Sequence, residues 1–135
     1  MTDTEGKMYY IAKHYNWLND KGNVKAIKGN EKGYAKIKDI VRGCSLCVHH
    51  LNNGQLIINL LISFTAKSRY EVACSKAVDV FKNHFQSEVK NSTWESSMGD
   101  GRVYDRYFVD VTNSDLPEIV KMIEEVRNKL SDGKV

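Results

Sequence analysis

Two apolar runs meet at Asn53-Gly54 within residues 41–63, and this dipeptide constrains the fold more than any other feature of the chain. A two-residue type I′ turn needs positive φ at both positions, which asparagine and glycine tolerate. The dipeptide therefore predicts a β-hairpin in which Leu51 lies opposite Leu56 and His49 opposite Ile58. In that register, the face of the hairpin that carries His49 lies on the core, and the face that carries His50 is mixed.

A helix is expected after this hairpin. Ser68 and Glu71 have the spacing of a capping box, which predicts a helix from Ser68 to about Gln86. Apolar residues recur along it at helical spacing, so one stripe should face the core and Cys74 should be a buried thiol. The stripe consists of Tyr70, Ala73, Cys74, Ala77, Phe81 and Phe85.

A second hairpin and a second helix follow. Asp100-Gly101 has the same turn chemistry and predicts strands at 93–98 and 102–112, with Glu95 opposite Arg106 as a cross-strand ion pair. Trp94 and Met98 are then expected on the face of Val103, Tyr107, Val109 and Val111, opposite Tyr104, Arg106 and Phe108. Asp115 caps the last helix, whose stripe consists of Leu116, Ile119, Val120, Ile123, Val126 and Leu130.

Residues 41–131 therefore form a tandem ββα pattern, and the expected fold is a single α+β domain with two layers. An antiparallel sheet of four to six strands carries two helices on one face, because neither ββα unit can close a core alone. Residues 1–7 are expected to be frayed and residues 8–40 to add N-terminal strands, at 8–18, 24–28 and 34–41. A helix is the alternative for 8–18, where the periodicity is not decisive.

The composition predicts an ordinary globular protein of the cytoplasm, with 41% hydrophobic and 27% charged residues. No apolar run approaches the roughly 20 residues that cross a membrane, and the N-terminal residues lack a signal-peptide pattern. We therefore expect no membrane association. Three cysteines without an export signal indicate reduced thiols.

The first half of the chain is basic. Residues 1–67 hold ten lysines and arginines against five acidic residues, whereas residues 68–135 hold ten against twelve. The residues of interest in the basic region are Lys25, Lys28, Lys36 and Arg42. Such a cluster can face phosphates or an acidic protein, and the alternative is a solvated lysine-rich surface. Because lysine is a point charge, any nucleic-acid contact is expected at the backbone rather than at base edges.

Catalytic and metal signatures are weak. Cys44 and Cys47 form a CxxC beside His49 and His50, but a strand directs each pair to opposite faces and no second ligand cluster follows, so no metal or other cofactor is expected. A metal-independent ribonuclease needs a histidine, a cation and a tyrosine around a phosphate. His50 with Lys36, Arg106 and Tyr104 supplies those residue types, although nothing in the sequence brings them together.

Tyr104, Arg106 and Phe108 form a stripe that could stack bases. The surrounding residues do not match the RNP1 pattern of RNA-binding sheets. The alternatives are packing beneath the N-terminal strands and a subunit interface, where tyrosine, phenylalanine and arginine are enriched.

The sequence as a whole is best interpreted as a small, non-enzymatic binding module. Its expected partner is a nucleic acid or nucleotide, or another protein, with homo-oligomer formation through an exposed sheet edge. By analogy, an accessory or inhibitor protein of a mobile element would have this character. The expected binding residues are Lys25, Lys28, Lys36, Arg42, His50, Tyr104, Arg106 and Phe108.

Overall fold

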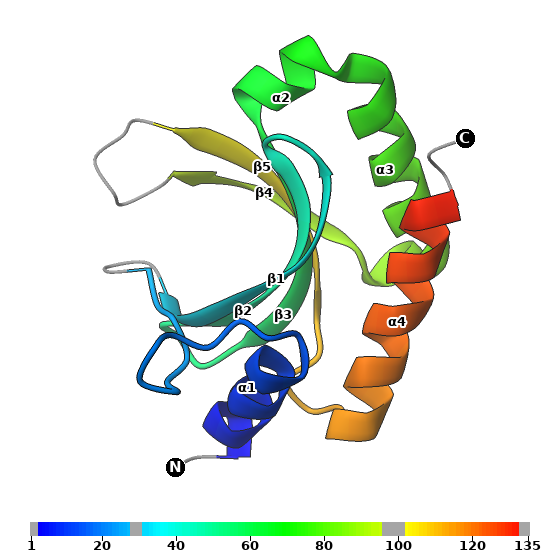
Figure 1. Ribbon diagram of the computed structural model, residues 1–135. Helices are drawn as coiled ribbons and strands as arrows, with labels where there is room; N and C mark the ends of the chain where they lie inside the picture. The colour runs from blue at the N-terminus through cyan, green and yellow to red at the C-terminus, as the bar shows by residue number, and fades with distance from the viewer. Residues whose placement is uncertain (1–2, 28–30, 96–101, 133–135) are drawn as a thin grey trace.

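The computed structural model describes residues 3–27, 31–95 and 102–132 and shows two layers, a five-stranded antiparallel sheet and four helices (Figure 1). The expected α+β fold is confirmed. The strand order is β1-β2-β3-β5-β4. Along the chain the elements are α1 (Asp3–His14), β1 (Glu31–Val41), β2 (Cys44–Leu51), β3 (Leu56–Ser63), α2 (Phe64–Arg69), α3 (Glu71–Phe85), a 3-10 turn (Gln86–Glu88), β4 (Lys90–Glu95), β5 (Val103–Asp110) and α4 (Leu116–Asp132).

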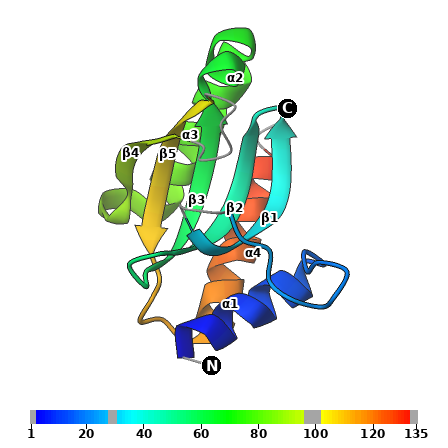
Figure 2. The same cartoon turned by 90° about the vertical axis from the view of Figure 1, so that its left-hand side faces the viewer.

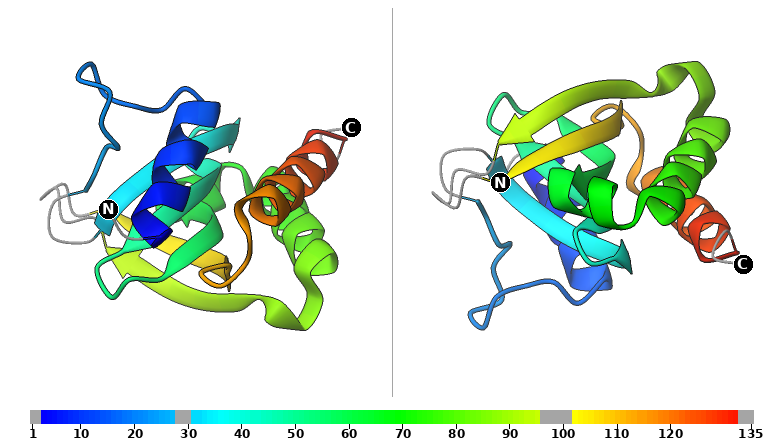
Figure 3. Two further views of the ribbon diagram at one scale, coloured as in Figure 1. Left: turned by 90° about the horizontal axis from the view of Figure 1, so that it is seen from below. Right: turned by 90° about the horizontal axis from the view of Figure 1, so that it is seen from above.

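The tandem ββα pattern is present. Strands β2 and β3 precede α2 and α3, and strands β4 and β5 precede α4. Figure 2 faces the sheet and shows α3 and α4 behind it, and the end-on views of Figure 3 place both helices to one side of the strands. Of the expected N-terminal strands only β1 forms, at the sheet edge beside β2.

One apolar core fills the space between the sheet and the helices. Leu46, Val48, Ile58 and Leu60 contribute from the central strands, and each is fully buried. The expected stripes of α3 and α4 meet them, with Phe81 at 0% exposure and Cys74 buried as predicted. Burying a side chain as large as phenylalanine contributes about 1.5–3 kcal/mol, so this face supplies most of the stability.

Residues 8–18 are not a strand. They belong largely to α1, where Met8, Ile11 and Ala12 have i, i+3, i+4 spacing and are buried in the same core. Acidic residues in its first turn and Lys13 and His14 in its last turn suit the helix dipole. The expected strand at 24–28 is also wrong. Its described residues, 24–27, form no strand, and only an isolated bridge joins Leu18 to Val24.

The central hairpin forms one register step from the predicted one. His50 pairs with Leu56 and His49 with Ile57, because the loop is longer than two residues and the Leu51 amide donates to the Gln55 carbonyl. Asn53 Oδ1 accepts from the Gln55 amide at 3.0 Å and stabilises this longer loop. A one-residue slip exchanges the two faces of a strand, so His49 leaves the core face and His50 joins it.

The second hairpin also differs from its prediction. Ser92 lies opposite Arg106 and Glu95 opposite Val103, so the expected Glu95–Arg106 pair is wrong. Trp94 lies opposite Tyr104 and therefore shares the face of Arg106. Met98 and the Asp100-Gly101 turn lie outside the described residues.

The predicted capping box at Ser68 is wrong as well. Ser63 caps α2 by accepting from the Ala66 amide at 3.0 Å, and Ser68 lies inside that helix. Tyr70 separates α2 from α3.

The sheet is strongly curled because β1 is irregular. Its pairing with β2 shifts at three places within eleven residues. Each such bulge bends a strand and increases its twist. The curl leaves the helices on one face and a concave surface on the other (Figure 1).

Among the described residues, no helix is both long enough and apolar enough to cross a membrane.

Candidate functional site

The concave surface, which we call the open face, lies opposite α1, α3 and α4. Strand register assigns its side chains, since each pair of partners points to the same side. Its members are Glu31, Tyr34, Lys36, Asp39, Ser45, Cys47, His49, Leu51, Ile57, Asn59, Leu61, Ser63, Lys90, Ser92, Trp94, Tyr104, Arg106, Phe108 and Asp110. The centre of the open face is buried and its margins are partly exposed.

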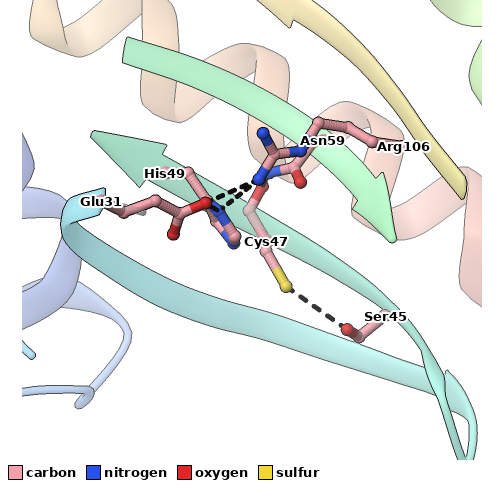
Figure 4. Close-up of polar contacts among 6 residues, drawn as sticks. All are labelled: Glu31, Ser45, Cys47, His49, Asn59 and Arg106. Atoms are coloured by element: carbon pink, nitrogen blue, oxygen red, sulfur yellow. Dashed lines mark hydrogen bonds and ion pairs between the residues drawn. The ribbon is translucent and has the colours of Figure 1, made fainter. Parts of the chain in front are cut away.

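A buried polar cluster lies at the centre of the open face (Figure 4). Arg106 donates from Nη2 to Glu31 Oε1 at 2.6 Å, and His49 Nδ1 hydrogen-bonds to the same oxygen. Arg106 Nη2 lies 3.0 Å from His49 Nδ1. The three residues come from β1, β2 and β5, so the Glu31–His49–Arg106 cluster joins strands that only the curl brings together.

The cluster is electrostatically incomplete. Burial lowers the pKa of His49, and the Arg106 charge acts in the same direction while Glu31 opposes it, so His49 is neutral and its Nδ1–H donates to the carboxylate. Among the described residues, Glu31 Oε2, Arg106 Nε and Asn59 Oδ1 are buried without a hydrogen-bond partner. Burying these atoms costs desolvation free energy that no hydrogen bond offsets. The cluster therefore contributes little to the stability of the fold.

An aromatic row crosses the open face. Ring centroids lie 6.2 Å apart from Trp17 to Tyr34, 6.0 Å from Tyr34 to His49, 5.9 Å from His49 to Trp94 and 5.2 Å from Trp94 to Tyr104. These spacings are those of favourable aromatic pairs. The row therefore runs continuously from the loop after α1 to the first residues of β5.

Cations lie over Trp17, at one end of this row, and over Trp94, next to the other end. Lys25 Nζ is 4.4 Å and Lys36 Nζ 5.5 Å from the Trp17 ring centroid. The Arg106 guanidinium is 5.1 Å from the Trp94 ring. Each contact is of cation–π type and orders the ring that it covers.

A polar hollow adjoins the Tyr104 end of the row. It has a volume of about 600 Å³ and three arginines line it, namely Arg42, Arg69 and Arg102, together with Tyr70 and Tyr104. No carboxylate is among its lining residues within the described chain. We call it the arginine hollow.

Three elements bring these arginines together. Arg42 occupies the turn between β1 and β2, where Gly43 has a φ of +88° that favours glycine. The Ser63 amide donates to the Gly43 carbonyl at 2.8 Å and joins this turn to the end of β3. Arg69 ends α2, which starts at that same strand end, and Arg102 precedes β5.

The predicted binding residues divide between these places. Lys36, Tyr104, Arg106 and Phe108 share the open face, as expected for the stripe on β5, and Lys25 lies beside it over Trp17. Arg42 joins Tyr104 in the arginine hollow. Lys28 lies outside the described residues.

His50 is separated from this group because it points to the helix face. The sequence could not bring it to Lys36, Arg106 and Tyr104, and the structure places it on the other side of the sheet from all three. It lines a hollow of about 330 Å³ with Glu5, Tyr9 and Lys32. Burial lowers the pKa of His50, the Lys32 charge adds to this effect, and Glu5 opposes it.

Sequence reasoning missed five residues of the candidate site. Glu31 falls between two of the predicted N-terminal strands and His49 falls on the predicted core face, because the bulges of β1 and the longer hairpin loop have no clear sequence signal. Trp94 was assigned to the wrong face by the register error. Arg69 and Arg102 lie apart from the lysine cluster in the sequence, and no other sequence signal marks them as site residues.

The cysteines make no metal cluster. Cys44 and Cys47 point to opposite faces, as predicted, and all three cysteines are free and buried. Burial raises the pKa of the Cys47 thiol to about 11. In the part of the chain that the structure describes, no group of three or more histidine, cysteine, aspartate or glutamate side chains converges.

Comparison of the chain with models of known protein families, with curated proteins and with solved structures finds no match.

Proposed function

We propose that this protein is a small binding module that takes an anionic partner of the nucleotide or nucleic-acid class through its phosphates. The observation that carries the proposal is the arginine hollow. Three guanidinium groups around one polar hollow, without a carboxylate in its lining, favour an anion. Arginine presents a planar fork that matches phosphate oxygens, which suits this chemistry better than a lysine surface does.

The neighbouring charges support the same proposal. Asp105, at the start of β5, is engaged by Lys67 at 2.8 Å, so its carboxylate is neutralised beside the hollow. Arg42 and Arg69 are exposed and contribute little to packing. Their charges are therefore available to a ligand without a folding penalty.

The test measures fluorescence anisotropy of labelled single-stranded RNA and duplex DNA at low and near-physiological salt. We expect micromolar binding that weakens as salt rises, because phosphate contacts release counterions. The double variant Arg42→Ala/Arg69→Ala should lower affinity at least tenfold. Lys121→Ala, which removes one charge from the exposed side of α4, is the matched control and should change affinity less than twofold.

Either of two results would contradict the proposal. Absence of binding at low salt would make the arginines a solvated surface. Binding that survives high salt, or that the arginine variant leaves unchanged, would place the ligand elsewhere.

A second candidate is a metal-independent ribonuclease-type activity at His50. The observation in its favour is the hollow that gathers His50 with Tyr9, Lys32 and Glu5, which are a base, a hydroxyl, a cation and an acid. His50→Gln, which fills most of the buried imidazole's space, should then abolish cleavage of RNA while thermal melting shows that the fold is retained. Failure of the wild-type protein to cleave any RNA would exclude this candidate.

A further inference from the structure

We propose that the anionic partner is a single-stranded nucleic acid, whose unpaired bases stack on Trp94 and Tyr104 while its phosphates occupy the arginine hollow. This inference rests on the proposed function and adds the ligand's structural class. The feature that joins the two parts is Tyr104, which lines the hollow and also ends the aromatic row.

The register of β4 and β5 places the stacking residues. Trp94 and Tyr104 are direct partners on the open face, their ring centroids are 5.2 Å apart, and both rings are partly exposed. The Arg106 guanidinium, which is buried, lies 5.1 Å from the Trp94 ring centroid. Phe108 follows two residues further along the same face of β5 and is also partly exposed. A phosphate held in the hollow therefore brings its own nucleoside to a ready-made aromatic surface.

The charges of the open face fit a single-stranded nucleic acid better than a single nucleotide. Lys25 and Lys36 lie at the Trp17 end of the aromatic row, and the arginine hollow lies at the Tyr104 end. Two carboxylates of the open face are paired, Asp39 with Lys36 at 3.2 Å and Glu31 with Arg106, so Lys25 rather than Lys36 is the cation that reaches a phosphate at the Trp17 end. Asp110, at the far end of β5, accepts from Gln55 at 2.9 Å. A polymer of phosphates can reach cations at both ends of the row.

Stacking selects single strands. A base must show its ring face to an aromatic side chain, and in a duplex these faces are covered by neighbouring pairs. Stacking is also tolerant of sequence, because every base has such a face. The protein should therefore prefer unpaired strands and discriminate weakly among sequences.

The experiment compares four labelled ligands by anisotropy: a single-stranded oligoribonucleotide, a strand of the same length with abasic sites throughout, a duplex, and a mononucleotide. The abasic strand keeps the phosphates and lacks the bases. We expect the ordinary strand to bind about tenfold or more tightly than the abasic strand or the duplex, since each stacked base contributes at about that level. The mononucleotide should bind most weakly, because it reaches only one end of the row.

Variants locate the stacking surface. Trp94→Leu and Tyr104→Leu should reduce the affinity for the ordinary strand to that for the abasic strand. Tyr10→Leu, which alters a 59% exposed tyrosine on α1, is the matched control and should have no effect. Tyr104→Phe keeps the ring and should keep the preference for bases. Thermal melting of each variant shows whether the fold is retained.

The outcomes separate this inference from the proposed function. Equal affinity for the ordinary and abasic strands would overturn stacking and leave phosphate binding intact. A mononucleotide that binds as tightly as the strand would overturn the single-strand assignment. Absence of binding to every ligand would remove the proposed function itself. Because the wild-type comparison needs no substitution, the test remains decisive even if the tryptophan variant fails to fold.

Discussion

The two faces of the curled sheet are built from alternate residues of the same strands and differ in almost every physical respect. The helix face carries aliphatic and aromatic side chains that α1, α3 and α4 cover, and its core is closed. The open face carries a buried ion pair, a neutral histidine and an aromatic row, and several of its buried polar atoms lack partners within the described chain. The first arrangement suits stability, whereas the second retains polar and aromatic groups at a cost in stability.

The largest expected effect tests this division with two phenylalanines. Phe81→Ala on the helix face removes a ring with 0% exposure and should lower the free energy of unfolding by about 3–5 kcal/mol. Phe108→Ala on the open face removes a partly exposed ring and should cost about 1–2 kcal/mol. Urea unfolding measures both values. Equal losses would show that the open face is as important to stability as the core.

A second effect concerns the buried ion pair. Arg106→Met leaves the Glu31 carboxylate buried beside a neutral histidine and should destabilise the protein by about 3 kcal/mol. The double variant Glu31→Leu/Arg106→Met removes both charges and should regain most of that loss, because apolar replacements of a buried pair are often neutral.

The exposed Lys67–Asp105 pair is the control for this cycle. Lys67 is 59% exposed, so the coupling between Lys67→Ala and Asp105→Ala should stay below about 1 kcal/mol. A coupling in the Glu31–Arg106 cycle as small as in this control would mean that burial adds nothing to the interaction of Glu31 with Arg106.

The helix face could largely be predicted from the sequence, and the open face could not. Periodic stripes identified Phe81, Ile119 and Ile123 as core residues because helix packing depends on local spacing alone. The sequence also predicts that Tyr104, Arg106 and Phe108 share one face of a strand, because the alternation of side chains between the two faces depends only on local spacing.

The predictions that were wrong depended on the strand register and on the curl of the sheet. A loop one residue longer than a two-residue type I′ turn exchanged the places of His49 and His50, and no local signal distinguishes the two loops. The contact between Glu31 and Arg106 spans 75 residues and needs the bulges of β1. The arginine hollow likewise assembles from three separate connections, so only the folded chain reveals it.

The smallest expected effect is on the pH dependence of stability, and it tests whether the open face holds His49 neutral. Burial lowers the pKa of His49 in the folded protein, whereas an unfolded histidine titrates near 6.5. Below about pH 6.5 the unfolded chain therefore binds a proton that the folded chain does not, and the free energy of unfolding falls as pH falls, by at most about 1.4 kcal/mol per pH unit for one group. His50 and His84 also have lowered pKa values and add to this fall, so the wild-type profile alone does not identify its source. His49→Gln should make the profile shallower between pH 8 and 5, because it removes one of the buried imidazoles. Because Glu31 opposes the other influences on His49, a profile that His49→Gln makes steeper would show that the carboxylate prevails and that the cluster holds a charged histidine. A profile that His49→Gln leaves unchanged would show that folding does not shift the pKa of His49, and it would equally contradict a histidine that burial holds neutral.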